Sequence, residues 1–591
     1  MNRKVRRAGQ SGINGRAPAQ DQNRVDPAFI STFLDEGWRL LSAGDDEQAL
    51  EVARRAIRLQ ESPDSRALFV ECVKRWSYFP GAEEVSDLIA RALQECWTEP
   101  ADLAGIVGGL LDHDPVAGPA IRRASEAWPR RLPLSELLGL PGLAAISQNP
   151  LLQAWIQSGR LMGSHFERFL TSLRAGLLEA ACGDRPPDGA DAIALGCALA
   201  RQCHINEYIY DLAPGEFERA EQLRSRIGKA LAEQKKLLPF CVAVMGAYFE
   251  LHDLPIDARA VRSLPHSLKT LLSEAAREVA AQRKHCETMP RLTAINDRVS
   301  AAVRRQYEEN PYPRWIKLPP AMPPVPVDDG FRSSFPASIY RPMGKPTGVD
   351  ILIAGCGTGH HSILFARSFL GARTLAVDLS LSSLSYAKEK SRAMGLSGIE
   401  YAQADILELA QFDRRFDIIS SSGVLHHLDD PEKGWRVLLS LLRPDGCMHV
   451  GIYSEIACRN ISAARDWLAT RGYTGSTDDI RRARQDLASA AEQDTRFADV
   501  LRCPDFYSTS ECRDLLFHTK ERRFTIPEIQ SFLENHNFQF LGFTLGRHLL
   551  DQFHQQFPGG REDDLTLWHS FENTHPDTFK GMYQFWMQRR R

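Results

Sequence analysis

One glycine-rich loop that directly follows an apolar segment constrains this chain more than any other feature. Residues 351–359 read ILIAGCGTG, so four apolar residues precede three glycines at alternate positions. A short apolar run of this kind is typical of a buried strand. Alternate glycines leave the backbone bare, so that a ligand can lie against it. We therefore expect a strand that ends in a ligand-binding turn.

The segment after this loop predicts a βαβ unit with a nucleoside site. A helical pattern, HHSILFARSFLG, leads into the apolar strand RTLAVDLS, which brings Asp378 to a strand end. This position is roughly twenty residues past the first glycine, as a ribose-binding acid requires. A carboxylate there accepts hydrogen bonds from both ribose hydroxyls. Taken alone, the unit fits NAD nearly as well as other nucleosides.

Three further segments in fixed order move the balance away from a dinucleotide. The loop reads G-x-G-x-G rather than G-x-G-x-x-G, and it is followed by GIEYAQADILEL, FDIISSSGVLHHLDDPEKGW and LLRPDGCMHVGIYS. This order resembles the class I S-adenosylmethionine-dependent methyltransferases over residues 349–454. The resemblance implies a Rossmann-like, doubly wound α/β domain over residues 346–591, with S-adenosylmethionine at the carboxyl ends of its first strands.

The same resemblance implies a role for particular residues. The loop glycines would bend around the methionine part of the cofactor, Asp378 would hold the ribose, and Asp405 with Ile406 would meet the adenine. The end of the fourth strand would lie near the sulfonium. The residues so assigned are Gly355, Gly357, Gly359, Asp378, Asp405, Ile406, Ser421 and Ser422, with Gly423 beside the last two.

One position departs from the family pattern. The family often has an acidic residue two positions before the first loop glycine, whereas this chain has Ile353 there. Asp350 lies too early in the sequence to be its obvious substitute. Another group is therefore expected to bind the amino group of the cofactor.

Methyl transfer needs alignment more than covalent help from the protein, because the methyl donor is already activated. A base is required only if the acceptor must lose a proton. His426 and His427 in VLHHLDDP, and Tyr453 after the fifth strand, are the candidate catalytic residues. The histidine pair has an alternative, purely structural interpretation. We expect no metal site.

About seventy residues, 454–523, separate the fifth strand from the next helix and strand, TIPEIQSFLENHNFQFLGFTL. Such a connection is far longer than usual. We expect it to form a helical substrate cap at the acceptor end of the sheet. Tyr507, Arg513 and His518 are candidates for acceptor contacts, with ordinary packing or solvated charge as the alternative.

Apolar residues recur three and four apart over residues 27–305, which predicts an α-helical domain. Near residues 34–62, small residues have the spacing of a single tetratricopeptide repeat, in which they let two helices pack closely. These positions are Gly37, Leu41, Gly44, Ala49, Ala53 and Ala56. The basic segment before this domain, residues 1–26, lacks the apolar core of a signal peptide, and we expect a disordered tail.

A proline-rich segment, residues 306–345, joins the two halves and begins with QYEENPYPRW. Proline removes backbone donors and disfavours a helix. One interpretation is a lid that places Tyr307 or Tyr312 near the sulfonium; the other is a linker that these tyrosines and Trp315 pin to the next domain.

Composition limits the partners. A chain of 591 residues exceeds one hydrophobic core, and a net charge of -3 with 25% charged residues gives no sign of a nucleic-acid partner. Twelve cysteines without a C-x-x-C pair fit a reducing compartment, so we expect a cytoplasmic protein. No apolar run is long enough to predict a membrane span.

Taken together, the arrangement resembles bacterial tetratricopeptide-repeat methyltransferases. Helical repeats commonly present surfaces to other proteins, so the resemblance implies a protein or peptide acceptor docked by the helical domain. Two alternatives remain open: a small-molecule methyltransferase, and a non-catalytic adaptor that binds the cofactor.

Overall fold

The computed structural model describes residues 27–140, 142–253, 256, 258–309 and 311–590. The expected disordered tail, residues 1–26, lies outside this range. By its internal contacts the chain divides into two compact units, Met1–Ser77 and Tyr78–Arg591. The boundary predicted at the proline-rich segment falls inside the second unit, and the predicted division into domains stays a prediction.

The described part of the first unit is a bundle of short helices. Small residues lie at its helix contacts: Ala49, Ala53 and Ala56 have no exposed surface. A Cβ atom on Gly37 would come 2.4 Å from a methyl carbon of Leu68, so a larger residue there would displace that side chain. Close helix packing at the expected positions is therefore present, while the assignment to a tetratricopeptide repeat stays a prediction. The helices are α1 (Pro27–Ala43), α2 (Asp46–Leu59) and α3 (Pro63–Val73).

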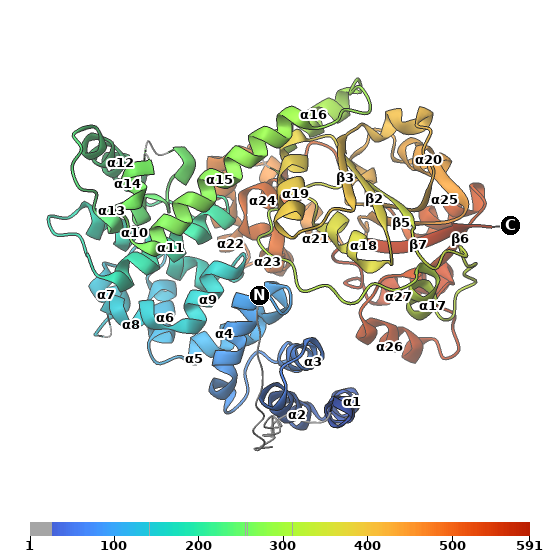
Figure 1. Cartoon of the computed structure of the whole chain (residues 1–591), viewed down its shortest axis with the longest axis horizontal. Helices are drawn as coiled ribbons and strands as arrows, with labels where there is room; N and C mark the ends of the chain where they lie inside the picture. The colour runs from blue at the N-terminus through green and yellow to red at the C-terminus, as the bar shows by residue number, and fades with distance from the viewer. Residues whose placement is uncertain (1–26, 141, 254–255, 257, 310, 591) are drawn as a thin grey trace, which may run out of the picture. The chain divides into compact units, whose positions relative to one another are not determined.

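The second unit begins with a helical part, as the helical periodicity predicts, and its last helix ends at Glu309 (Figure 1). Its long helix α15 packs on α11 and also on α19 of the sheet domain, and so joins the two parts of this unit. The elements are η1 (Ala82–Val85), α4 (Ser86–Glu95), η2 (Pro100–Leu103), α5 (Ala104–His113), α6 (Ala117–Ala127), α7 (Leu134–Leu138), α8 (Gly142–Gln148), α9 (Pro150–Ser158), α10 (Ser164–Cys182), α11 (Ala190–Ile205), α12 (Glu216–Ala232), α13 (Pro239–Met245), η3 (Leu251–Asp253), α14 (Ala258–Arg262), α15 (His266–Thr288) and α16 (Arg298–Glu309).

The sheet domain confirms the Rossmann-like fold. Among the described residues, the 7-stranded sheet has the order β3-β2-β1-β4-β5-β7-β6. Strands β1 to β5 pair in parallel, whereas β7 pairs antiparallel with both β5 and β6. The strand order reverses between β1 and β4, where such folds bind their ligands. The strands are β1 (Asp350–Ala354), β2 (Arg373–Asp378), β3 (Ile399–Gln403), β4 (Phe416–Ser422), β5 (Leu442–Ile452), β6 (Phe538–Phe543) and β7 (Tyr583–Arg589).

Helices cover both faces of this sheet. Since alternate residues of β1 point to opposite faces, neighbouring residues of this strand join different cores. Ile351 and Ile353 join a core with α17 and α19, whereas Leu352 and Ala354 join a core with α20, α25 and α27. The remaining helices of the domain are α17 (Val327–Ser334), α18 (His360–Ser368), α19 (Leu381–Ala393), η4 (Ile406–Gln411), η5 (Leu425–His427), α20 (Pro431–Leu441), α25 (Ile526–Asn535), α26 (Arg547–Gln556) and α27 (Leu565–Thr574).

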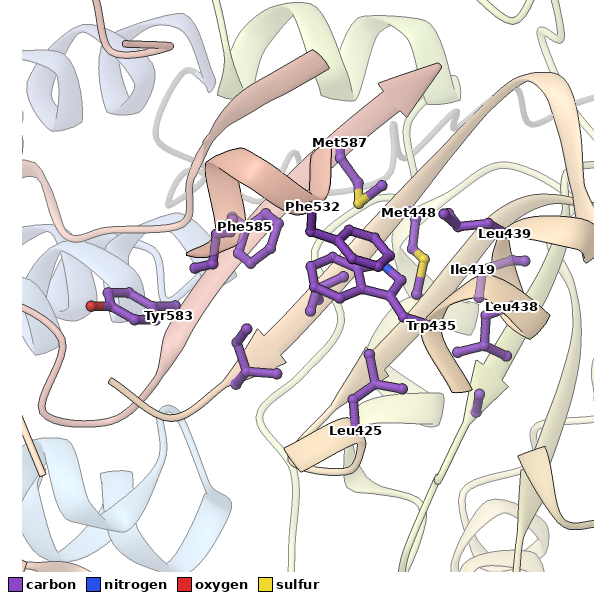
Figure 2. Packing of buried hydrophobic residues seen from close by; sticks show 14 of the residues in the cluster. Ile419, Leu425, Trp435, Leu438, Leu439, Met448, Phe532, Tyr583, Phe585 and Met587 are labelled. Carbon is purple, nitrogen blue, oxygen red and sulfur yellow. The ribbon is translucent and has the colours of Figure 1, made fainter. Parts of the chain in front are cut away.

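The indole of Trp435 lies at the centre of the second core. It stacks on the ring of Phe532 with 3.8 Å between ring centroids and an interplanar angle of 16°. Figure 2 shows Leu438 and Met448 packed around this pair. Large aromatic rings contribute strongly to the free energy of a core when they are buried. The contact fastens α25, which follows the long insertion, onto α20, which precedes it.

The insertion after β5 is helical, as expected. It consists of α21 (Arg459–Ala469), α22 (Thr477–Ala490), α23 (Thr495–Arg502), η6 (Pro504–Tyr507) and α24 (Thr509–Phe517). We call these elements the cap. No helix within the described ranges is both long and apolar enough to cross a membrane.

A buried ion pair fixes the cap to the helical part of the second unit. The Arg484 guanidinium donates to both carboxylate oxygens of Glu167, at 3.0 and 2.6 Å. Their side chains are 1% and 8% exposed. Arg481 also donates to the Tyr208 carbonyl oxygen, and the Thr509 hydroxyl donates to that of Glu207. The cap is therefore held from outside the sheet domain.

Replacing Glu167 by Gln should test this attachment. The substitution leaves the guanidinium of Arg484 buried without a counter-charge, which costs about 3–5 kcal/mol of unfolding free energy. Chemical denaturation of the full chain measures the loss. The control is Asp478→Asn, because Asp478 pairs with Arg481 on the same helix but is 84% exposed. Exposed pairs contribute little, so equal losses in the two variants would contradict a fastening role for Glu167.

Candidate functional site

A cavity of about 240 Å³ lies at the carboxyl ends of β1, β2 and β4. We call it the glycine-loop cavity. Parallel strands put their carboxyl ends at one edge, and this explains why residues far apart in sequence meet there. It brings together most of the predicted site residues and several that the sequence did not reveal. Its lining includes Tyr307, Tyr312, Gly355, Gly357, Asp378, Asp405, Ile406, Ser422, Gly423, His427, Tyr453, Asp514 and Met582.

The carboxylate of Asp378 is fixed at the end of β2. One oxygen accepts a hydrogen bond from the Gly357 backbone N–H at 2.8 Å, and the other accepts one from the Ser380 N–H at 2.9 Å. Burial raises the pKa of Asp378, while these two backbone donors act in the opposite direction. The carboxylate is thus oriented before any ligand binds, with lone pairs left for ribose hydroxyls.

Asp405 carries an oxygen without a partner. Its Oδ1 accepts a hydrogen bond from the Leu407 N–H at 3.0 Å, whereas its buried Oδ2 makes no hydrogen bond of good geometry among the described residues, with the Ser300 hydroxyl as its nearby polar neighbour. Burial is also the main reason that the pKa of this carboxyl is raised. An unpaired buried acceptor is costly unless a ligand supplies a donor. An adenine amino group beside Ile406 is a donor of the required kind.

The bare face of Gly357 is covered by the chain itself. A Cβ atom on Gly357 would come 2.6 Å from the Tyr312 carbonyl oxygen. The same carbonyl accepts a hydrogen bond from the Thr358 N–H at 3.3 Å. Because Gly357 has no side chain, the proline-rich segment can pack against the loop there, as a ligand can. Gly359 does not line the cavity; its close neighbour is Ala387 of α19, so its glycine serves helix packing rather than the predicted cofactor contact.

The proline-rich segment acts both as an anchor and as a wall. The buried Trp315 donates from its indole nitrogen to the Thr358 carbonyl oxygen at 3.1 Å. Tyr307 and Tyr312 stack with 6.1 Å between ring centroids, and both line the cavity. The Tyr307 hydroxyl donates to a carboxylate oxygen of Asp514 at 2.7 Å. Trp315 thus makes the contact expected of an anchored linker, and Tyr307 and Tyr312 lie where a lid would lie.

The rings of His427 and His518 lie against each other beside Asp514. The His427 ring stacks on His518 at 3.7 Å, and its Nδ1 lies 2.9 Å from the Lys520 carbonyl oxygen. A carbonyl only accepts, so Nδ1 of His427 is the donor, and in the neutral ring the lone pair lies on Nε2. His518 accepts the Lys520 N–H at its Nδ1, and burial lowers its pKa to about 2, so this neutral ring carries its proton on Nε2.

His427, Asp514 and His518 also form a group whose ligand atoms lie within 4.8 Å of one another. A metal ion would need the Nε2 lone pair of His518. That atom carries the proton in the tautomer that the Lys520 N–H imposes. The arrangement thus favours a proton-accepting nitrogen on His427 over a metal centre.

Several predicted residues are not brought to the cavity. The Ser421 hydroxyl donates to the Ala354 carbonyl oxygen within the sheet. His426 packs against Tyr453, and burial lowers its pKa far below the usual value, so it is a neutral core residue. The Tyr507 hydroxyl donates to a backbone carbonyl, and Arg513 pairs with Glu309. None of these four side chains lines the cavity, so their predicted contacts with the cofactor or the acceptor stay predictions.

The acid that the family often has at the position of Ile353 is not supplied by another residue of β1. Ile353 is buried in the sheet, and Asp350 lies at the opposite end of the strand, where it pairs with Arg373 and Arg443. The cavity instead receives the carboxylate of Asp514 from the cap. No local motif marks Asp514, because only the folding of the cap over the sheet brings it there.

A second cavity of about 480 Å³ lies under the cap, and we call it the cap cavity. Tyr312, Tyr453 and Met582 line both cavities, so the two meet at these side chains. The rest of its wall comes from α21 and the two residues before it, from α23, η6 and α24, from Glu521, and from the residues just before β7. A molecule in the cap cavity would therefore approach the glycine loop past these three residues.

Comparison with known proteins agrees with this architecture. Residues 351–446 match the family described as "Methyltransferase domain". An uncharacterized protein of Synechococcus sp. is 28% identical over 268 residues, which cover 42% of this chain and 61% of that protein. The ubiquinone/menaquinone biosynthesis C-methyltransferase of Klebsiella pneumoniae is 32% identical over 126 residues, or 21% of this chain and 50% of its own length.

Phosphoethanolamine N-methyltransferase 1 of Arabidopsis thaliana is 28% identical over 160 residues, which cover 27% of this chain and 30% of that enzyme. Among solved structures, PKMT2 from Rickettsia typhi in complex with AdoHcy aligns with a TM-score of 0.36 and 16% identity, over 46% of this chain and 55% of its own. The chain thus spans between 30% and 61% of the length of these curated relatives.

The sheet order, the glycine loop and the family match define a class I S-adenosylmethionine-dependent methyltransferase domain. Its cofactor is S-adenosylmethionine. The residues present fit this molecule, since Asp378 is pre-oriented for a ribose and Asp405 has a buried oxygen that lacks a donor.

Replacing Asp378 by Asn should weaken cofactor binding at least about tenfold, or about 1.4 kcal/mol, because ribose hydroxyls lose a charged partner. Calorimetry with S-adenosylmethionine measures the affinity. Asp350→Asn is the control, since it removes the same charge from the other end of the neighbouring strand. Equal affinity in the Asp378 variant and wild type would reject the ribose assignment.

Replacing Gly357 by Ala should weaken cofactor binding about tenfold, because the added Cβ displaces the Tyr312 carbonyl. Gly395→Ala is a matched control: both glycines have a positive φ, of +50° and +72°, but nothing lies within 4 Å of a Cβ at Gly395. Both variants should lose about 1–2 kcal/mol of stability from backbone strain. Cofactor affinity, measured by calorimetry, should fall in the Gly357 variant alone.

Proposed function

We propose that the protein is a methyltransferase that moves a methyl group from S-adenosylmethionine to a side chain of a protein or peptide. The observation that carries this proposal is the meeting of the two cavities at Tyr312, Tyr453 and Met582. One cavity has the residues for the cofactor, and the other gives an acceptor a route to it. A cofactor-binding adaptor would not need the second cavity.

Bound in the glycine-loop cavity, S-adenosylmethionine supplies an electrophilic methyl group. The residues of the chain then need to orient the bound cofactor and to enclose it. Asp378 and Asp405 fix the nucleoside, and the rings of Tyr307 and Tyr312 exclude water from the same space. His427 lines the cavity with a free Nε2 lone pair, so it is the candidate base for an acceptor that must lose a proton.

The cap supports a macromolecular acceptor. The helical part of the second unit holds the cap through Glu167 and Tyr208, so a protein docked on these helices would be presented to the cap.

A small-molecule acceptor is the second candidate. A cavity of about 480 Å³ is in the usual range for small ligands. Two of the relatives are named as methyltransferases of phosphoethanolamine and of ubiquinone/menaquinone biosynthesis.

Transfer of label separates these candidates. The full-length protein is incubated with methyl-radiolabelled S-adenosylmethionine and an extract of the cells that produce it, and macromolecules are then separated from small molecules. We expect label in material that protease digestion releases, and much less of it with Asp378→Ala at a limiting cofactor concentration. Label confined to small molecules would favour the second candidate. Bound cofactor with no transfer to any fraction would contradict an enzyme.

A further inference from the structure

The cap cavity contains one carboxylate that no basic side chain pairs with. Asp505, in η6, lines this cavity, and no ion pair or hydrogen bond to its carboxylate exists within the described part of the chain. The basic residues that line the cavity are all paired with other acids. These pairs are Arg465 with Glu521 at 2.7 Å, Arg502 with Asp499 at 2.8 Å, and Lys580 with Asp577 at 2.9 Å.

The nearby cation Arg160 does not change this conclusion. Arg160 acts on Asp505 electrostatically, but it forms its ion pair with the buried carboxylate of Glu511. Burial raises the pKa of Asp505 to about 6; Arg160 acts against this rise, and Asp514 adds to it. Asp505 is therefore mostly ionised at pH 7.5. A buried carboxylate without a counter-ion is stabilised when a cation binds beside it.

Two phenols lie where this cavity meets the glycine-loop cavity. Tyr312 and Tyr453 line both cavities, and the hydroxyl of neither has a hydrogen-bond partner among the residues that the structure describes. Burial raises the pKa of both, and Asp505 contributes in each case, so the hydroxyls stay protonated. Their ring faces can also attract a cation, as aromatic rings do in proteins.

We propose that the cap cavity binds the methyl acceptor through an amine, with Asp505 as the counter-ion and Tyr312 and Tyr453 around the nitrogen. This inference rests on the proposed methyltransferase function and names its substrate class. A carboxylate or phosphate at the reacting end would meet an unpaired negative charge. An alcohol would leave the Asp505 charge uncompensated. An ammonium group satisfies both the carboxylate and the phenol oxygens.

The chemistry balances for such an acceptor. The bound ammonium first gives up one proton, for which the free Nε2 of His427 in the adjoining cavity is available. The nitrogen lone pair then forms the bond to the methyl carbon as the carbon–sulfur electron pair returns to sulfur. The product nitrogen is again positively charged, and one proton is released for each methyl group transferred.

Binding of simple probes to the full chain tests this inference without turnover. The probes are n-pentylamine, n-pentanol and pentanoate, which share a chain length and differ in the charge of the end group. Each is titrated at pH 7.5, with and without saturating S-adenosylhomocysteine, and binding is followed by ligand-detected NMR. We expect the amine to bind about tenfold more tightly than the alcohol, and pentanoate to bind least.

Asp505→Asn should lower amine affinity about tenfold and leave pentanol binding unchanged, because only the charge is lost. Glu455→Gln is the matched control, since it removes one charge from an exposed residue near the cap that lines neither cavity. Asp505 is absent from the glycine-loop cavity, so the variant should keep wild-type affinity for S-adenosylhomocysteine, which also shows that it is folded.

Equal binding of amine and alcohol to the wild-type protein would overturn the inference. So would unchanged amine affinity in the Asp505 variant, or a preference for pentanoate. Failure of the wild-type protein to bind S-adenosylhomocysteine would instead count against the proposed function. The titrations without S-adenosylhomocysteine keep the two results separate, because Asp505 and its charge do not depend on the cofactor.

Discussion

The buried pair between Glu167 and Arg484 is the interaction on which the rest of the site depends. It joins a helix of the N-terminal half to the cap, in surroundings where a single unpaired charge would be strongly destabilising. Because the cap is fixed, Asp514 reaches the glycine-loop cavity and Asp505 reaches the cap cavity. The sheet domain alone has neither carboxylate at its edge. The helical part of this unit therefore completes the site through the cap, in addition to any surface that it offers to other molecules.

The part of the site that sequence predicts is the part that lies at strand ends. Asp378 and Asp405 follow apolar strands at regular spacing, and parallel strands place their carboxyl ends together, so local patterns are enough to find them. The same reasoning predicts the sheet up to β6. It missed β7, although Tyr583, Phe585 and Met587 alternate with residues of the opposite face, since this strand returns between β5 and β6 from far along the chain.

What sequence could not predict depends on contacts between distant segments. Asp514 and Asp505 stand in the cap without any motif, and their meaning comes from the surfaces that fold around them. The glycines show a related limit: the spacing is that of a ligand loop, yet one glycine serves the Tyr312 carbonyl and another serves a helix contact. His426 and His427 are adjacent in sequence, but the backbone turns one ring into the core and the other towards the cavity.

The contact between the Tyr312 carbonyl and the Gly357–Thr358 turn has a kinetic consequence. This contact and the Trp315 anchor close one side of the nucleoside space, and the cap closes another. The proline-rich segment and the cap thus narrow the paths by which a nucleoside exchanges, whereas the cap cavity reaches the same space past Tyr312, Tyr453 and Met582. We expect movement of the proline-rich segment to influence how fast a nucleoside enters and leaves the glycine-loop cavity.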